Sequence, residues 1–321
     1  MSAQIRVFIK SILQVGLLTT IIISLVFLGI KPDPEHYFSG SLLQVELLKN
    51  TPGPRILLAG GSNVALGLDA ELMQQTLGLP VINDGLHAGL GVVPLKELKD
   101  YIHAGDVIVI SLEYSMFSNL DTMQGDPAFL ADWIEFAPRR TVYLFDPWAD
   151  APGIYVTMLQ RKVNRQVDIF LHGGSLEETR AFFEGKSFDA NGDFIGHLRD
   201  NVEPTSKIPD TGYPVVRLKD EIFVFLMDFQ RFARALGATV YFEAPASRHS
   251  NCLATGKSQM ENFFITFEQK SSIPVLTSMD EVCMPDKYFF DTPYHLNAQG
   301  RALRTKRLIE NLLKANAITK Q

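Results

Sequence analysis

A serine follows a short apolar run and two glycines at the start of the globular part of the chain. Residues 56–59 are apolar and typical of a buried strand, and Gly60 and Gly61 then precede Ser62. A serine on a tight strand-to-helix turn exposes its hydroxyl beside helix N-terminal amides. It can attack an acyl carbonyl if a base accepts its proton and N–H donors surround the oxyanion. The alternatives are a helix cap or a phosphate-binding turn, although the dinucleotide pattern G-x-G-x-x-G is absent.

The C-terminal region contains a carboxylate and an imidazole that could serve this serine. Asp291 precedes His295 by four residues, and Asn297 then offers a cap for a helix. A carboxylate that orients an imidazole, which in turn deprotonates a serine, is the arrangement of a catalytic triad. We therefore expect Ser62, His295 and Asp291 to meet in space. The alternative for His295 is a solvated histidine near a helix start.

Further candidates follow other predicted strands. The segment 83–91, Asn-Asp-Gly-Leu-His-Ala-Gly-Leu-Gly, comes after a short strand, and sites in open α/β sheets form beyond the carboxyl ends of strands. A glycine amide there could complete an oxyanion hole, and His87 is interpreted as a wall or substrate contact. Glu113 and Tyr114 follow the third strand and are predicted to bind substrate, as is Asn63. The alternatives are an ordinary glycine-rich turn and solvated strand ends, and Glu243 after a later strand has the same two interpretations.

The elements that must position these residues alternate between strand and helix. Apolar runs of β-branched residues fit the middle of a parallel sheet covered by helices. This rhythm predicts a doubly wound α/β domain over 55–315 with an irregular insertion at about 117–215, interpreted as a lid. The predicted strands are 55–59, 81–83, 107–112, 238–242 and 274–276, and the predicted helices are 69–77, 93–103, 128–136, 151–166, 217–235, 257–269 and 298–315.

The N-terminal region predicts a membrane anchor. Residues 11–30 contain no charged residue, and twenty helical residues span roughly 30 Å, the thickness of a bilayer core. Arg6 and Lys10 precede this stretch, so residues 1–10 are expected in the cytoplasm and the remainder outside it. A cleaved signal peptide is the alternative, but no small-x-small cleavage site follows directly. Residues 31–54 are predicted to be a linker with an amphipathic helix at 37–48 near the membrane.

Composition limits the class of partner and cofactor. The 321 residues carry a formal net charge of −6, which argues against nucleic acid because phosphate binding requires a basic surface. No H-E-x-x-H or H-x-x-x-H pattern predicts a metal site around His87, and we expect no cofactor. Cys252 and Cys283 flank the elements before the Asp291 loop and are predicted to form a disulfide, which requires an exported domain. Two free or buried thiols are the alternative.

Taken together, these motifs resemble the SGNH (GDSL-like) hydrolase family over most of the predicted exported part. Gly60-Gly61-Ser62-Asn63 resembles the first block, 83–89 the second, and Asp291 with His295 the last. The resemblance implies a three-layer, flavodoxin-like fold, Ser62 as nucleophile, and oxyanion donors at the amides of Ser62 and of Gly89, with Gly85 second. The chain departs from the family pattern at Gly61, in the Asp-to-His spacing, and in the third block. There, residues 112–115 replace the block that carries the asparagine donor, and an ionised Glu113 cannot donate.

The combination with an N-terminal membrane segment is similar to the SGNH-like proteins of bacterial envelope acylation, such as those of teichoic-acid D-alanylation and alginate O-acetylation. This resemblance implies a single-pass protein of the bacterial inner (plasma) membrane with its catalytic domain outside the cytoplasm. It implies a serine acyltransferase or esterase acting on an acylated envelope glycan or lipid, beside a multi-pass membrane O-acyltransferase. The alternative is a catalytically degenerate SGNH-like domain that binds glycan or such a membrane partner.

Overall fold

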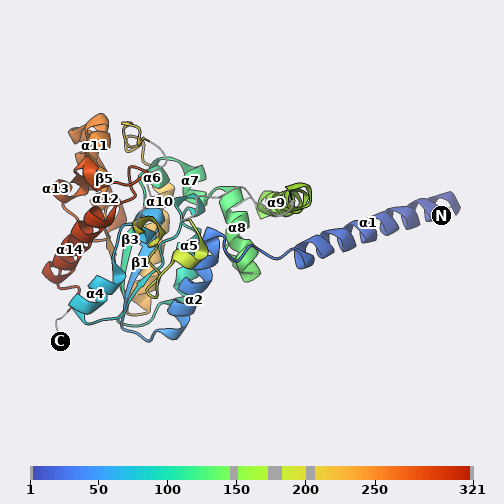
Figure 1. Cartoon of the computed structure of the whole chain (residues 1–321), viewed down its shortest axis with the longest axis horizontal. Coiled ribbons are helices and arrows are strands. Elements are labelled where there is room, and N and C mark those ends of the chain that lie inside the picture. The colour runs from blue at the N-terminus through green and yellow to red at the C-terminus, as the bar shows by residue number, and fades with distance from the viewer. Residues whose placement is uncertain (1–2, 145–150, 173–182, 200–206, 319–321) are drawn as a thin grey trace.

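The centre of the molecule is a four-stranded parallel sheet (Figure 1). The computed structural model describes residues 3–144, 151–172, 183–199 and 207–318. The strand order is β2-β1-β3-β4, and every neighbouring pair is parallel. The chain therefore starts in the middle of the sheet and winds outward in both directions, as predicted for a doubly wound domain. The strands are β1 (Ile56–Gly60), β2 (Val81–Asn83), β3 (Val107–Ser111) and β4 (Thr239–Phe242).

Alternate side chains of the central strands enter two separate cores. Leu57 and Ile108 belong to a core shared with α2 (Gly40–Asn50), α5 (Val93–Leu98), α10 (Asp220–Ala235) and α12 (Lys257–Ser271). Ile56 and Val107 belong to the core beneath α4 (Ala70–Leu77) and α14 (Ala298–Lys314). Because successive side chains of a strand point to opposite faces, continuous apolar runs require cover on both sides. Figure 1 shows β1 and β3 between α4 and α14 on one side and α2 and α5 on the other.

The remaining helices and strands extend this framework. A two-stranded parallel pair, β5 with β6, lies beyond β4. The other elements are α1 (Ala3–Gly29), α3 (Ser62–Ala65), α6 (Ser115–Ser118), α7 (Leu120–Gln124), α8 (Pro127–Phe136), α9 (Ala151–His172), α11 (His249–Thr255), α13 (Met279–Val282), β5 (Ser247–Arg248) and β6 (Cys283–Met284).

Most predicted elements are present, with three corrections. The predicted strand 274–276 is a single parallel bridge between Val275 and Phe242. The predicted helix 93–103 is shorter, because a 3-10 turn at Lys99–Tyr101 follows α5. The predicted helix 37–48 is not a separate membrane-surface helix, because α2 packs Val45 and Leu48 into the core against the sheet. Parts of the predicted insertion, at 145–150, 173–182 and 200–206, lie outside the described residues.

The N-terminal helix α1 extends away from the α/β body (Figure 1). Among the described side chains, the stretch long and apolar enough to cross a bilayer is Gln4–Ile22, which overlaps the predicted span 11–30. None of the residues in the apolar window of that stretch is buried inside the protein. A helix that is apolar all round is stable when lipid covers it. The part of the chain that the structure describes thus has one candidate membrane helix, near the N-terminus.

Candidate active site

Ser62, His295 and Asp291 form a hydrogen-bonded chain. The Nε2 atom of His295 lies 2.8 Å from the Oγ atom of Ser62. The Nδ1 atom of the same ring lies 2.7 Å from Oδ1 of Asp291. An ionised carboxylate can only accept, so the bond to Asp291 places a proton on Nδ1 and leaves Nε2 to accept from the serine hydroxyl. The four-residue spacing therefore brings the carboxylate to the ring, and the arrangement can remove a proton from Ser62.

The turn before Ser62 depends on two glycines. A side chain at Gly60 would lie 2.2 Å from the Ser111 carbonyl oxygen on the neighbouring strand. A methyl group at Gly61 would lie 3.0 Å from the nitrogen of Ala88. The chain then enters α3 directly at Ser62, a four-residue helix that precedes the predicted helix 69–77. As the first residue of α3, Ser62 has an amide without an acceptor inside that helix.

The loop that carries His295 is held from several directions. The Thr292 hydroxyl accepts the His295 amide at 3.0 Å, and Asn297 caps α14 by accepting the amides of residues 299 and 300. His197, from the predicted insertion, contacts the carbonyl of Leu296 through Nε2 at 3.0 Å. Burial is the main reason that the pKa of His197 falls to about 3, so its ring is neutral and donates this bond. The insertion thus supports the residue next to His295.

Arg304 connects the elements that carry Ser62 and His295. It projects from α14 and forms two bonds to the carboxylate of Glu243, at 3.0 and 2.7 Å. Its other contacts are the Asn63 carbonyl and the Ser111 hydroxyl. Glu243 is buried and paired with Arg304. It is therefore neither a substrate contact nor a solvated strand end, the two interpretations that the sequence allowed. Bidentate pairing with a buried guanidinium has strict geometry, which fixes α14 against β1 and β3.

The predicted substrate contact at Asn63 is wrong. Its side chain is completely buried, and the amide nitrogen lies 3.0 Å from the Ser111 hydroxyl. This places Asn63 beneath the serine turn, in the Arg304 network, with no surface open to a ligand.

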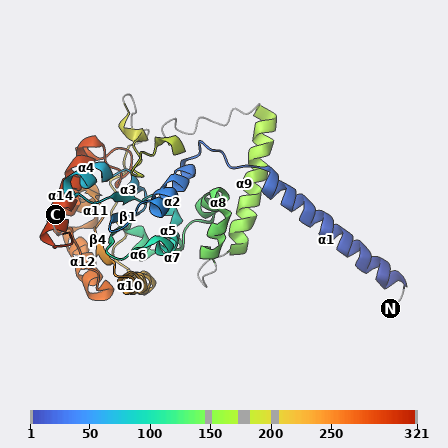
Figure 2. The same cartoon turned by 90° about the horizontal axis from the view of Figure 1, so that it is seen from below.

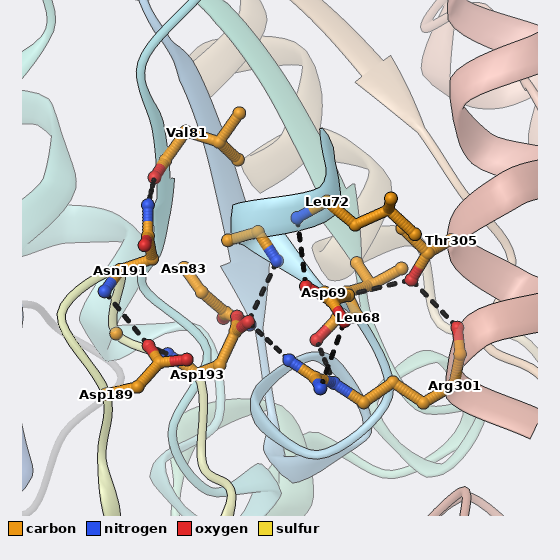
Figure 3. Close-up of polar contacts among 12 residues, drawn as sticks. Leu68, Asp69, Leu72, Val81, Asn83, Asp189, Asn191, Asp193, Arg301 and Thr305 are labelled. Carbon is orange, nitrogen blue, oxygen red and sulfur yellow. Dashed lines mark hydrogen bonds and ion pairs between the residues drawn. The ribbon is translucent and has the colours of Figure 1, made fainter. Parts of the chain in front are cut away.

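A second buried network reaches the same elements from the insertion (Figure 3). Asp193 pairs with Arg301 of α14 at 2.6 Å and accepts hydrogen bonds from the Asn83 side chain and the Ala70 amide. Arg301 also donates to the carbonyl of Leu68, shortly after α3. The insertion, the second motif and the helix after His295 are therefore joined by charged hydrogen bonds, which are stronger than neutral ones.

The glycine amides predicted as oxyanion donors are used elsewhere. The Gly85 amide donates to the Asn83 side chain at 2.9 Å, and the Gly89 amide donates to Nδ1 of His87 at 2.9 Å. Gly89 is required for space, since a side chain there would lie 2.2 Å from the Phe129 ring. The backbone amide available in this loop is instead that of Ala88. This residue lies against Gly61 and begins a 3-10 turn, so its amide has no acceptor within that turn.

His87 lies partly exposed beside the site, as a wall residue would. Its ring packs on Phe129 with the centroids 4.2 Å apart. Burial, and then the positive charge of a protonated His295, lower the pKa of His87 to about 4. Since Nδ1 accepts the Gly89 amide, the neutral ring carries its proton on Nε2, where it remains a donor.

The third-strand candidates separate into one site residue and one core residue. Glu113 is half-buried and lies two residues beyond Ser111, which pairs with Gly60 at the end of the neighbouring strand, and it is close enough to His295 to interact with it electrostatically. Burial raises the pKa of Glu113 to about 7, although a nearby His295 charge opposes this shift. Below that pH the Glu113 carboxyl is therefore protonated and can donate a hydrogen bond, in contrast to the ionised form expected from the sequence. Tyr114 is fully buried and packs on Tyr213 and Phe263, so its predicted substrate contact is wrong.

Cys252 and Cys283 are joined by a disulfide, with Cα atoms 6.2 Å apart. The bridge ties α11 to β6, the strand that precedes the His295 loop. Among the described residues, no group of three or more His, Cys, Asp or Glu side chains could hold a metal ion. The chemistry that the arrangement offers is proton transfer from a serine hydroxyl.

Sequence reasoning did not identify Arg301, Arg304, His197 or Ala88. The one sequence signal for the two arginines is their i, i+3 spacing, which places both side chains on the same side of α14. A fully solvated helix does not require such a spacing. His197 and Ala88 act through tertiary contacts that no local sequence pattern predicts. Comparisons with protein-family models and with curated proteins found no match to this chain.

Proposed function

We propose that this protein is a membrane-anchored, extracytoplasmic SGNH-like serine acyltransferase or esterase that acts on acyl esters of an envelope glycan or lipid. The observation that carries the proposal is the chain of contacts from Ser62 Oγ to His295 Nε2 and from His295 Nδ1 to Asp291. Each separation lies in the range that proton transfer and ring orientation require.

The reaction follows from these contacts. The Ser62 oxygen attacks the acyl carbonyl while Nε2 of His295 accepts the hydroxyl proton, and Asp291 stabilises the imidazolium. The tetrahedral intermediate expels its alcohol, which takes the proton back from His295 and leaves an acyl-serine. A sugar or polyol hydroxyl, or water, then gives its proton to His295 and attacks the acyl-serine. This second intermediate expels the Ser62 oxygen, which takes the proton from His295, so that transfer or hydrolysis regenerates Ser62.

Donors for the oxyanion are available beside Ser62. The amide of Ser62 and the amide of Ala88, which packs against Gly61, have no acceptor within their own helical turns. Glu113 follows β3 and interacts with His295, so it supplies a third group near the site, and its protonated carboxyl can donate a hydrogen bond. We assign these three groups to the oxyanion hole in place of the glycine amides and of the missing asparagine.

The SGNH-like assignment and the location are supported by the motifs and the fold together. Ser62 follows β1, 83–91 follows β2, and Glu113 follows β3, so the motifs share the carboxyl edge of one parallel sheet. The candidate membrane helix favours a single-pass protein of the bacterial plasma membrane with this site outside the cytoplasm. A multi-pass membrane O-acyltransferase is the proposed partner.

A fluorophosphonate probe tests the proposal directly, because it reacts with an activated serine. In the full-length protein, labelling should occur at Ser62 and should be lost in Ser62→Ala and His295→Ala. The matched control is Ser115→Ala, which changes a half-buried serine at the start of α6 and should label as the wild type does. Folded protein that takes no label would contradict the enzyme.

The alternative is a non-catalytic SGNH-like domain that binds glycan or a membrane partner. The observation in its favour is that the Gly85 and Gly89 amides are both bonded within the protein. Hydrolysis of a short acyl ester separates the two functions, since a binding module has no Ser62-dependent rate. Saturable glycan binding that persists in Ser62→Ala, without any such rate in the wild type, would favour the binding module.

A further inference from the structure

Helix α9 has one face that is fully engaged with the rest of the protein. Its buried residues Ile154 and Met158 enter a core that also contains Leu130 and Ile134 of α8. Three basic side chains on the same side pair with carboxylates of α8. These pairs are Arg161 with Asp132 at 2.6 Å, Lys162 with Glu135 at 3.0 Å, and Arg165 with Glu135 at 2.7 Å.

The opposite face of α9 is apolar and exposed. Its members are separated by seven, four, three and one residues, which places them on one side of a helix. They are Val156, Val163, Val167, Phe170 and Leu171, with exposed fractions of 55%, 41%, 49%, 86% and 66%. We call these five residues the α9 stripe. A contiguous exposed apolar stripe of this length marks an interaction surface.

The attachment of α9 to the end of α1 indicates which environment the α9 stripe faces. The Nζ atom of Lys162, at the middle of α9, donates to the carbonyl of Ile30 at 2.7 Å. Ile30 directly follows α1, and no charged residue occurs between Lys10 and Lys31. The end of the apolar stretch, where a membrane-spanning helix meets the headgroups, is therefore attached to the centre of α9.

The orientation of α9 agrees with this attachment. Figure 2 shows α9 lying across the inner end of α1, with α8 and the α/β body on the other side of α9. Because the α8 side is engaged, the α9 stripe faces away from the body, toward the side on which α1 runs. A helix in this position lies along the membrane surface rather than through it.

We propose that α9 is an interfacial helix whose stripe is inserted at the boundary between headgroups and acyl chains. The proposal rests on α1 being a membrane anchor. An amphipathic helix parallel to the membrane buries its apolar face at this depth, and basic residues near it attract anionic headgroups. Lys31, which directly follows the apolar stretch, is exposed there. With α1 and α9 both attached to lipid, the α/β body is held at a fixed orientation, which sets the height of Ser62 above the bilayer.

The test uses the full-length protein in vesicles of phosphatidylcholine and phosphatidylglycerol. The two native cysteines form the disulfide, so an introduced thiol can be labelled selectively with bimane. The test variants are Val163→Cys and Val167→Cys. The control is Val224→Cys, the same substitution at a residue of α10 that is 52% exposed. Lipids with a nitroxide on the acyl chain should quench the labels in α9 several-fold more than the control label, and aqueous iodide should do the reverse.

Failure of this proposal can be told apart from failure of the anchor and of the enzyme. A label at Leu18→Cys reports whether α1 is in the bilayer. Quenching at residue 18 but not at 163 or 167 would overturn the α9 proposal alone, including the case in which a protein partner covers the stripe. No quenching at any of the three positions would overturn the anchor and with it the α9 proposal. Fluorophosphonate labelling of Ser62 in the same vesicles reports the proposed enzyme independently.

Discussion

At the scale of single residues, the site depends on which atoms carry protons. His295 uses both ring nitrogens, one toward Asp291 and one toward Ser62, so its tautomer is determined by its partners. His87 is likewise held in one neutral form by the Gly89 amide. Glu113 differs from both, because its proton is retained by burial rather than by a hydrogen bond that the structure defines. The protonation state of Glu113 can therefore be tested by measuring how stability depends on pH.

We predict that Glu113→Gln stabilises the protein more at pH 8 than at pH 5. Burial raises the pKa of Glu113 from 4.5 to about 7, so between these values the folded state binds a proton that the unfolded state lacks. The free energy of unfolding contributed by Glu113 therefore falls as pH rises through this window and stays low above it. Glutamine cannot ionise and avoids this loss.

Thermal unfolding of the wild type and of Glu113→Gln at both pH values measures the effect. The control is Glu310→Gln, which changes an exposed residue of α14 and should give equal differences at pH 5 and pH 8. A Glu113→Gln advantage that is the same at both values would show that the Glu113 carboxyl is not held protonated by the fold.

At the scale of elements, α14 is fixed to the sheet by charge rather than by apolar packing alone. Its outer turns pack Leu308 and Leu312 on the core under α4, but its first turns place Arg301 and Arg304 beside the serine turn. Buried arginines are costly to desolvate and persist only when all their donors find acceptors. These contacts define the separation of the Ser62 and His295 loops more precisely than apolar contacts would.

We predict that Arg304→Met lowers the free energy of unfolding by about 3–5 kcal/mol, because it leaves Glu243 buried without a partner. The double variant Arg304→Met/Glu243→Met should recover much of this loss, since apolar replacements of both partners remove the uncompensated charge. Chemical denaturation of each variant gives the values. The control is Lys306→Met on the exposed face of α14. A single variant as stable as this control, or a double variant no better than the single, would contradict the assignment.

At the scale of the whole molecule, the disulfide and the candidate membrane helix give a consistent topology. The basic residues before the apolar stretch favour a cytoplasmic N-terminus, and the proposed export of the α/β body would put it in an oxidising compartment, where a disulfide persists. The Cys252–Cys283 bridge closes a segment of 31 residues that contains α12 and α13. In the chain-entropy account, closing such a loop stabilises the folded state by about 3–4 kcal/mol.

We predict that the bridge is fully formed in cells and that its loss destabilises the body. Denatured protein treated with a mass-tagged maleimide should take up no tag before reduction and two tags after it. Cys252→Ser/Cys283→Ser should unfold at a lower temperature than the wild type without reductant. Two tags on unreduced protein, or equal unfolding temperatures, would oppose the exported topology or the stabilising role.

Local patterns were sufficient for most of the elements and for the catalytic candidates. The predicted helix 69–77 is present as α4, and its ends are set locally, because Asp69 caps its start and Gly78 its end. The apolar run at 107–112 predicted a central strand, because only two-sided burial favours such a run. The types and order of Ser62, Asp291 and His295 were enough to expect contact between them, since a serine nucleophile needs a base and the base needs a carboxylate to orient it.

Tertiary structure decided which of the remaining candidates face the site. Asn63 and Tyr114 are next to site residues in sequence but point into the interior, because helix and strand geometry turns neighbouring side chains to different sides. Gly89 donates to His87 rather than toward Ser62, and the protonation of Glu113 depends on burial that no local pattern encodes. For Gly60-Gly61-Ser62, sequence alone determined a turn that presents a hydroxyl, and packing of distant segments determined the base and the donors around it.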